Sequence, residues 1–128
     1  MKKSLLIGLM EALSKKERMA IKKFVRSPFF NHREDVVNLC NYLMECLFVH
    51  NVIPTKEQAY KKVYGKVAYD DHKLRLCMSF LFKLLERFLV YESFFSDEVH
   101  VSTRLAKIYR QRNMQKHFDR TLKEAQQK

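Results

Sequence analysis

The sequence contains very little glycine and proline. Two of each occur in 128 residues, whereas a chain of average composition would hold roughly 15 in total. Tight hairpins need glycine, proline or asparagine at fixed turn positions, so this scarcity excludes a hairpin-rich β protein. Walker loops and dinucleotide fingerprints need several glycines close together, and they are excluded for the same reason. We therefore expect an all-α chain.

Long apolar runs are also missing, and cysteines are few. No run approaches the ~20 apolar residues that span a bilayer, so we expect no transmembrane helix. The apolar stretch 5–10 follows two lysines, but Glu11 interrupts it and no small-residue cleavage site follows, which favours a short amphipathic helix over a secretory signal. Cys40, Cys46 and Cys77 show no regular spacing. This pattern excludes a disulfide framework and favours a reducing cytoplasm.

Enzyme and metal motifs are absent as well. The chain has no Gly-x-Ser-x-Gly elbow and no His-Glu-x-x-His helix. Asp70 and Asp71 lie beside His72, but we expect Asp70 to cap a helix and Asp71 to stabilise its first turn. Cys46 and His50 lie four residues apart without the short Cys-x₂₋₄-Cys pairs of structural zinc sites. We therefore predict no enzymatic activity, no catalytic or metal-binding residue and no cofactor.

Helical periodicity runs through almost the whole chain. It predicts six to seven helices, at about 4–13, 14–26, 32–50, 55–65, 71–95, 97–112 and 114–128. Ser14-x-x-Glu17 and Thr55-x-x-Gln58 are capping boxes, in which a hydroxyl and a carboxylate or amide satisfy two free amides at a helix start. Asn31 is the expected cap of the third helix.

The segment 71–95 is apolar around much of its circumference, through Leu74, Cys77, Met78, Leu81, Leu84, Leu85, Phe88 and Leu89. A helix with such a wide apolar arc is expected to be a central pillar that several neighbours pack against. Pro28 ends the second helix, and we expect the two aromatic side chains that follow it, Phe29 and Phe30, to fill the core.

The last two helices form an antiparallel hairpin whose pattern is similar to one TPR-like solenoid repeat. The side chains expected to point inward are Val101, Leu105, Ile108, Tyr109, Met114, Phe118, Leu122 and Ala125. A single repeat of this kind cannot bury its own apolar face. Because the helical pattern still runs at Lys128, we expect the chain to be the front part of a longer protein. The 128 residues form one predicted domain, with a helical core at 1–96 and the hairpin at 97–128.

Four stretches together resemble a known family. They read Leu-Ser-Lys-Lys-Glu at 13–17, Phe-Val-Arg-Ser-Pro-Phe-Phe-Asn at 24–31, Tyr-Asp-Asp-x-Lys-Leu-Arg at 69–75 and Leu-Leu-Glu-x-Phe-Leu at 84–89. This pattern is similar to the amino-terminal region of large uncharacterised helical proteins from Bacteroidetes. The resemblance spans nearly all of the chain and implies a helical fold, a bacterial cytoplasmic setting and a further downstream part. It implies no mechanism and no site residues.

Charge is unevenly distributed along the chain. Of the formal net charge of +11, segments 1–26 and 99–128 carry +6 each and segment 55–69 carries +3, whereas the two remaining segments carry −2 each. Basic helix faces that gather phosphates would give salt-dependent binding of nucleic acid. The candidate contacts are Lys15, Lys22, Lys23, Arg26, Lys61, Lys62, Lys66, Arg104, Lys107, Arg110, Lys116, Arg120 and Lys123.

Two functions follow from this pattern. The first is a non-catalytic helical interaction module that binds a protein partner or a downstream domain. The alternative is a nucleic-acid-binding or transcription-regulatory domain, with a helix-turn-helix-like unit at 55–90 that would place Arg75, Ser79, Lys83 and Arg87 in the major groove. That second helix is largely apolar and its exposed arc has no Asn or Gln to read adenine. Basic segments that merge into one stripe would favour nucleic acid, whereas an apolar groove along the final hairpin would favour a protein partner.

Overall fold

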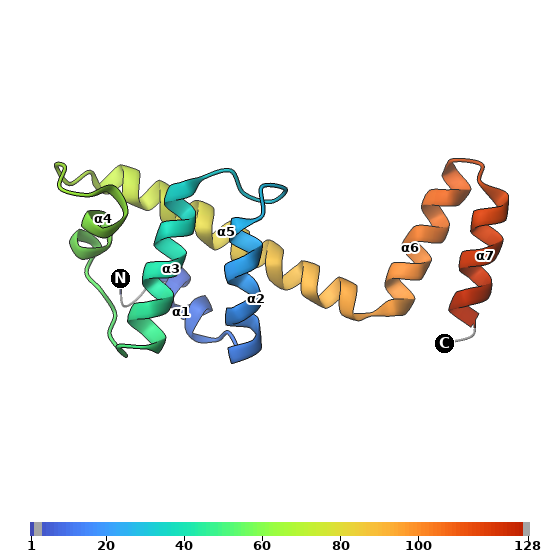
Figure 1. Ribbon diagram of the computed structural model, residues 1–128, viewed down its shortest axis with the longest axis horizontal. Helices are drawn as coiled ribbons and strands as arrows, with labels where there is room; N and C mark the ends of the chain where they lie inside the picture. The colour runs from blue at the N-terminus through green and yellow to red at the C-terminus, as the bar shows by residue number, and fades with distance from the viewer. Residues whose placement is uncertain (2–3, 127–128) are drawn as a thin grey trace. The chain divides into compact units, whose positions relative to one another are not determined.

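A computed structural model describes Met1 and residues 4–126 of the protein. Within these residues the chain forms seven α-helices and no strand (Figure 1), which confirms the predicted all-α class. The helices are α1 (Leu5–Glu11), α2 (Lys15–Arg26), α3 (Glu34–Phe48), α4 (Lys56–Tyr64), α5 (Asp71–Ser96), α6 (Glu98–Gln111) and α7 (Gln115–Gln126).

Both predicted capping boxes are confirmed. The Ser14 hydroxyl accepts a hydrogen bond from the Glu17 amide at 3.2 Å, and the Glu17 carboxylate accepts one from the Ser14 amide at 2.8 Å. Thr55 and Gln58 make the same reciprocal pair at the start of α4. Each such cap contributes about 1 kcal/mol. These caps fix where α2 and α4 begin.

The predicted capping role of Asn31 is wrong. Helix α3 begins after Arg33, which makes no capping hydrogen bond with its side chain. The Asn31 amide group instead donates to the carbonyl oxygens of Val25 at 2.8 Å and Arg33 at 3.1 Å, and its oxygen accepts from the Arg33 amide at 3.0 Å. Asn31 therefore closes the connector between α2 and α3 by binding the last turn of α2.

The chain divides into two compact units, residues 1–88 and 89–128, and the division lies within α5. In the first unit, α3 packs against α2 and against α4. Figure 1 shows α2 and α4 on opposite sides of α3. The largest fully buried side chains of this unit are Ile7, Met10, Ile21, Val25, Val36, Leu39, Cys40, Leu43, Leu74, Leu81, Leu85 and Phe88.

The long central helix is confirmed, and the apolar arc predicted for it is its buried face. Six of its apolar residues are buried, all of them within the stretch 74–88, and no later residue of α5 is buried. Leu76 and Phe80 are exposed. The guanidinium carbon of Arg33 lies 4.5 Å from the centroid of the Phe80 ring. α5 therefore buries one face within 74–88 and leaves much of its remaining surface exposed.

The aromatic pair after Pro28 is divided between core and solvent. Phe30 stacks on Phe24 with ring centroids 4.2 Å apart, and Phe24 meets Phe88 edge-on at 5.4 Å. Phe29 is 88% exposed, so its predicted place in the core is wrong. The Phe29 ring lies nearly perpendicular to the Phe30 ring, with the ring centroids 5.1 Å apart. One aromatic ring fills the space available above Phe24, and the second remains outside.

In the second unit, α6 and α7 pack along each other, and small side chains make the contact. Ala106 and Thr121 are buried, and Ser102 and Ala125 are half-buried. Small side chains allow two helices to approach closely, which leaves larger neighbours at the edges of the contact. The inward prediction is accordingly wrong for Leu105 and Ile108, which are exposed and do not line the space between the helices, whereas Leu122 faces α6 but is only partly covered. Asn113, with a φ of 57°, lies in the turn between the two helices.

Candidate functional site: a groove with one cationic wall

Helix α2 presents two different polar surfaces. Its buried face is formed by Ile21, Phe24 and Val25. At 100° per residue, four cations fall within an arc of about 80° beside that face; we call Lys15, Arg18, Lys22 and Arg26 the cationic row. Lys16 and Lys23 lie further round the helix, exposed and outside this row. The predicted basic face of α2 thus has two parts: the cationic row, which lies beside α3, and the pair Lys16 and Lys23, which does not.

The cationic row forms one wall of a groove between α2 and α3, which we call the α2–α3 groove. Its volume is about 640 Å³. The opposite wall comes from the outer face of α3 and the residue after it, with Asn41, Met44, Glu45, Phe48 and Val49. Met44 is buried and Phe48 half-buried at the bottom. The groove therefore combines a charged wall with an apolar floor.

Contacts at the floor hold one cation in place. The guanidinium carbon of Arg18 lies 3.9 Å from the centroid of the Phe48 ring, and its Nη1 lies 3.4 Å from the Leu13 carbonyl oxygen, to which it donates. An arginine flat on an aromatic ring adds about 0.5–1 kcal/mol at such a site. Among the described residues, the side chains of Lys15, Lys22 and Arg26 make no hydrogen bond or ion pair. Three members of the cationic row are therefore available to an anion.

The α3 wall carries the opposite charge. Glu45 is the acidic residue that lines the groove, and its Oε1 lies 3.3 Å from Nε2 of His50. Both side chains are more than half exposed, so this contact is weak and open to water. The groove is positive along α2 and weakly acidic along α3.

The structure brings together only part of the predicted phosphate-binding set. Lys15, Lys22 and Arg26 share the groove, whereas Lys23 does not line it. Lys61 and Lys62 lie on α4, and Lys66 follows it; α4 contacts α3 and contributes no residue to the groove. The remaining predicted cations, Arg104, Lys107, Arg110, Lys116, Arg120 and Lys123, belong to the second unit.

The predicted phosphate-binding set leaves out Arg18, although Arg18 belongs to the basic face of the same helix, and the apolar floor was not predicted. Arg18 lies one turn from Lys15 and one turn from Lys22, so helical spacing alone could have placed it in the row. Met44 and Phe48 carried no such signal, because their role depends on α3 lying beside α2. Met19, at 65% exposure, is the apolar residue that α2 itself adds to the groove.

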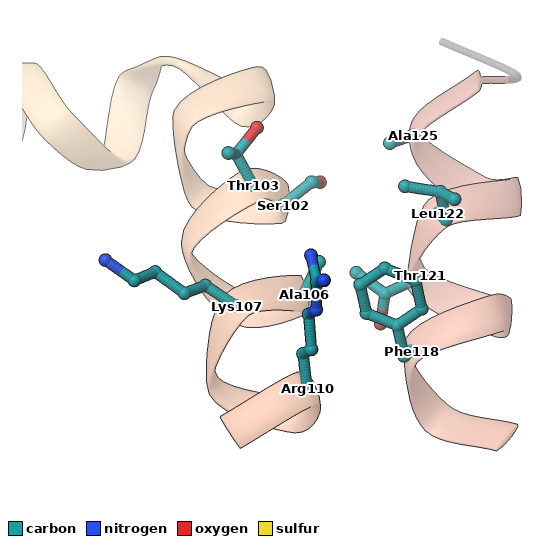
Figure 2. Close-up of a pocket in the computed structure, with 9 residues that line it drawn as sticks. All are labelled: Ser102, Thr103, Ala106, Lys107, Arg110, Phe118, Thr121, Leu122 and Ala125. Atoms are coloured by element: carbon teal, nitrogen blue, oxygen red, sulfur yellow. The ribbon is translucent and has the colours of Figure 1, made fainter. Parts of the chain in front are cut away.

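A second, smaller groove of about 280 Å³ lies between α6 and α7 (Figure 2). Figure 2 shows Phe118 projecting from α7 toward α6 and Arg110 lying along the edge of α6 that faces α7, while Lys107 points away from α7. The rest of the lining is small or apolar, with Leu122 at the edge. Of the other predicted cations in this unit, Arg120 pairs with Glu124 at 3.0 Å. This is the apolar hairpin groove that would favour a protein partner.

The helix-turn-helix candidate residues Arg75, Ser79, Lys83 and Arg87 are all exposed on α5. Near its start, Asp71 accepts a hydrogen bond from the Tyr69 hydroxyl at 2.7 Å and lies 3.5 Å from Arg75 and 3.7 Å from Lys56. The hydrogen bond from Tyr69, opposed by desolvation and aided by the two cations, lowers the pKa of Asp71. Asp70 accepts from the Lys73 amide at 3.2 Å, which confirms its predicted capping role.

The three cysteines are free and buried. Burial raises the pKa of both Cys40 and Cys77 to about 12, and a thiol in that state is a poor nucleophile and metal ligand. Within residues 4–126, no three His, Cys, Asp or Glu side chains are placed to share a metal ion. These thiols pack as small apolar side chains.

Comparison with known proteins gives no assignment: no protein-family model, no curated protein and no solved structure matches the chain. Among the described helices, none is both long and apolar enough to cross a membrane.

Proposed function

We propose that this chain is a non-catalytic helical interaction module and that its α2–α3 groove binds an acidic surface of a partner protein. The observation that carries the proposal is the cationic row, three of whose members have no partner among the described residues, beside an apolar floor. Here Met19 and Val49 are exposed in the same groove, and a protein partner would bury them.

Charge sets the expected partner. The chain carries +11 overall, so long-range attraction selects acidic surfaces and speeds association at low salt. Lys15, Lys22 and Arg26 then provide short-range contacts to carboxylates. The groove between α6 and α7, which Arg110 lines, is a further surface for the same class of partner. The cytoplasmic setting and the downstream part implied by the family resemblance belong to this proposal as well.

A matched pair of double variants tests the proposal. Lys15→Glu with Lys22→Glu reverses two charges inside the groove, and Lys16→Glu with Lys23→Glu reverses two charges one residue further along the same helix, outside it. Peptides would be selected from a displayed random library on the native protein. We expect enriched acidic and apolar peptides that lose binding to the first variant and keep it with the second. Selected peptides that bind both variants equally well would contradict the proposal.

Nucleic acid is the second candidate, and the cationic row is the observation that favours it. Phosphate contacts would give an affinity that falls steeply with salt. The same two variants decide between the candidates when labelled duplex and single-stranded DNA are titrated at low salt. Binding that disappears only with Lys15→Glu and Lys22→Glu would assign the groove to nucleic acid, whereas negligible DNA binding by the native protein would remove this candidate.

A further inference from the structure

The cationic row has the spacing of one face of a helix. Its members follow one another at intervals of three, four and four residues, and at 1.5 Å per residue the row is about 16 Å long. A second α-helix lying alongside α2 has the same rise. Residues at i, i+4, i+7 and i+11 on that helix would therefore stay within about one residue, ~1.5 Å, of the members of the row over its whole length.

The two walls of the groove differ in a way that selects the occupant. The α2 wall is cationic, whereas the α3 wall presents Asn41 and Glu45. A nucleic-acid strand carries phosphates along its whole length, and Glu45 would repel those that lie near the α3 wall. An amphipathic helix, in contrast, can carry carboxylates on one flank, apolar side chains in the middle and neutral or basic side chains on the other flank.

The floor matches the middle of such a helix. Met19 is exposed, Phe48 is half-buried under Arg18, and Met44 closes the bottom. Methionine side chains adapt to varied apolar partners, and a helix in a groove anchors through residues at i, i+3, i+4 and i+7. The apolar stripe of a docked helix would thus meet this floor while its acidic flank faces the cationic row.

We infer that the occupant of the α2–α3 groove is one acidic amphipathic α-helix of a partner protein, aligned with α2 and carrying carboxylates at i, i+4, i+7 and i+11. This inference rests on the proposed function and specifies its partner. Lys15, Lys22 and Arg26 bind the carboxylates at i, i+7 and i+11, and the carboxylate at i+4 lies beside Arg18, which remains stacked on Phe48. The flank of the helix that faces Glu45 is neutral or basic.

Two synthetic peptides of about 18 residues, long enough to cover the row, test the inference. The registered peptide carries glutamates at i, i+4, i+7 and i+11 beside a stripe of leucines. The shuffled peptide has the same composition and matched helicity, with its glutamates on all sides of the helix. Fluorescence anisotropy would measure both against the native protein. The registered peptide should bind about tenfold more tightly, because three weak ion pairs together give a factor of that size.

The groove variants complete the experiment. Lys15→Glu with Lys22→Glu should remove the advantage of the registered peptide, and Lys16→Glu with Lys23→Glu should preserve it; circular dichroism checks that both variants keep the helical content of the native protein. Equal binding of the two peptides would overturn the inference and leave the proposed function standing. If neither peptide binds while DNA does, the inference is overturned in favour of nucleic acid. Absence of any binding would overturn the inference and the proposed function together.

Discussion

Tyr64→Phe is the substitution that most directly tests how α4 is held on α3. The Tyr64 hydroxyl donates a 2.6 Å hydrogen bond to Oδ2 of Asp35, and the same carboxylate accepts from Arg33 at 2.7 Å and 3.0 Å. The Asp35 side chain is 17% exposed. A hydrogen bond to a charged acceptor contributes about 1.5–3 kcal/mol, so we expect Tyr64→Phe to lower the free energy of unfolding by about 2 kcal/mol.

The same contact predicts a pH dependence. Burial alone would raise the pKa of Asp35, but the hydrogen bonds from Arg33 and Tyr64 outweigh it and lower the pKa from 3.8 to about 2. A carboxylate with a lowered folded-state pKa stabilises the fold above the unfolded-state pKa and loses that contribution as pH falls through the folded-state pKa. The shift corresponds to about 2 kcal/mol, lost between about pH 4 and pH 2.

Urea unfolding followed by circular dichroism at pH 7 and at several pH values below 4 measures both effects. Tyr69→Phe is the matched control, because it removes a 2.7 Å hydrogen bond from a tyrosine to Asp71 at an exposed site. We expect Tyr69→Phe to cost much less than Tyr64→Phe, and the deficit of Tyr64→Phe to shrink toward pH 2. Equal costs for the two variants, or a deficit that does not change with pH, would refute the reasoning.

Three further predictions concern packing, backbone and thiols. Phe88→Ala should lower the free energy of unfolding by about 3–5 kcal/mol in the same assay, because the ring is fully buried; a loss below 1 kcal/mol would contradict its central place in the core. Gly65→Ala should destabilise the fold by about 1–2 kcal/mol, because Gly65 has a φ of +84°. Gly8→Ala should instead stabilise the fold by about 0.5–1 kcal/mol, because Gly8 lies in α1 with open space around it. Equal effects of the two substitutions on the free energy of unfolding would be inconsistent with this backbone difference. Cys40 and Cys77 should react with iodoacetamide only after unfolding, as mass spectrometry of native and urea-treated protein would show, and rapid labelling of the native protein would disprove their burial.

Local chemistry made the helix boundaries predictable. The pairs at Ser14 and Thr55 and the caps at Asp70 and Asp97 act within three residues of the chain, so their sequence signals carry over directly into the structure. Asn31 was the exception, because the carbonyl oxygen of Val25, six residues away, competes for its side chain. A helix end that is capped by a residue close in sequence can be predicted. A cap whose side chain is taken by a more distant backbone group cannot.

Packing between helices was less predictable. Helical spacing assigned Leu105, Ile108 and Leu122 to the inside of the hairpin because they are large and apolar. The contact is made by smaller residues, including Ala106 and Thr121, whose position on the helix surface matters more than their hydropathy. An apolar stripe shows which residues avoid water, but it does not show how many of them a single neighbouring helix can cover.

The candidate site has one part that follows from local sequence and one part that depends on packing between helices. The cationic row lies on one helix and could be read from sequence spacing, Arg18 included. Its apolar floor comes mostly from Met44 and Phe48 on another helix, and no pattern within either helix states that α2 and α3 lie side by side. The position of Arg18 in the row therefore follows from the sequence, whereas the apolar floor follows only from the packing of α3 against α2.

The methyl signals of the methionines, observed by NMR in the intact protein during titration with the registered peptide, test the central claim most directly. Met19 and Met44 line the α2–α3 groove, whereas Met10 is buried in the core and Met114 lies beside the turn of the hairpin. We expect the signals of Met19 and Met44 to shift progressively and saturate, while those of Met10 and Met114 stay in place. Shifts confined to Met114, or no shift at Met19 at saturating peptide, would contradict the central claim.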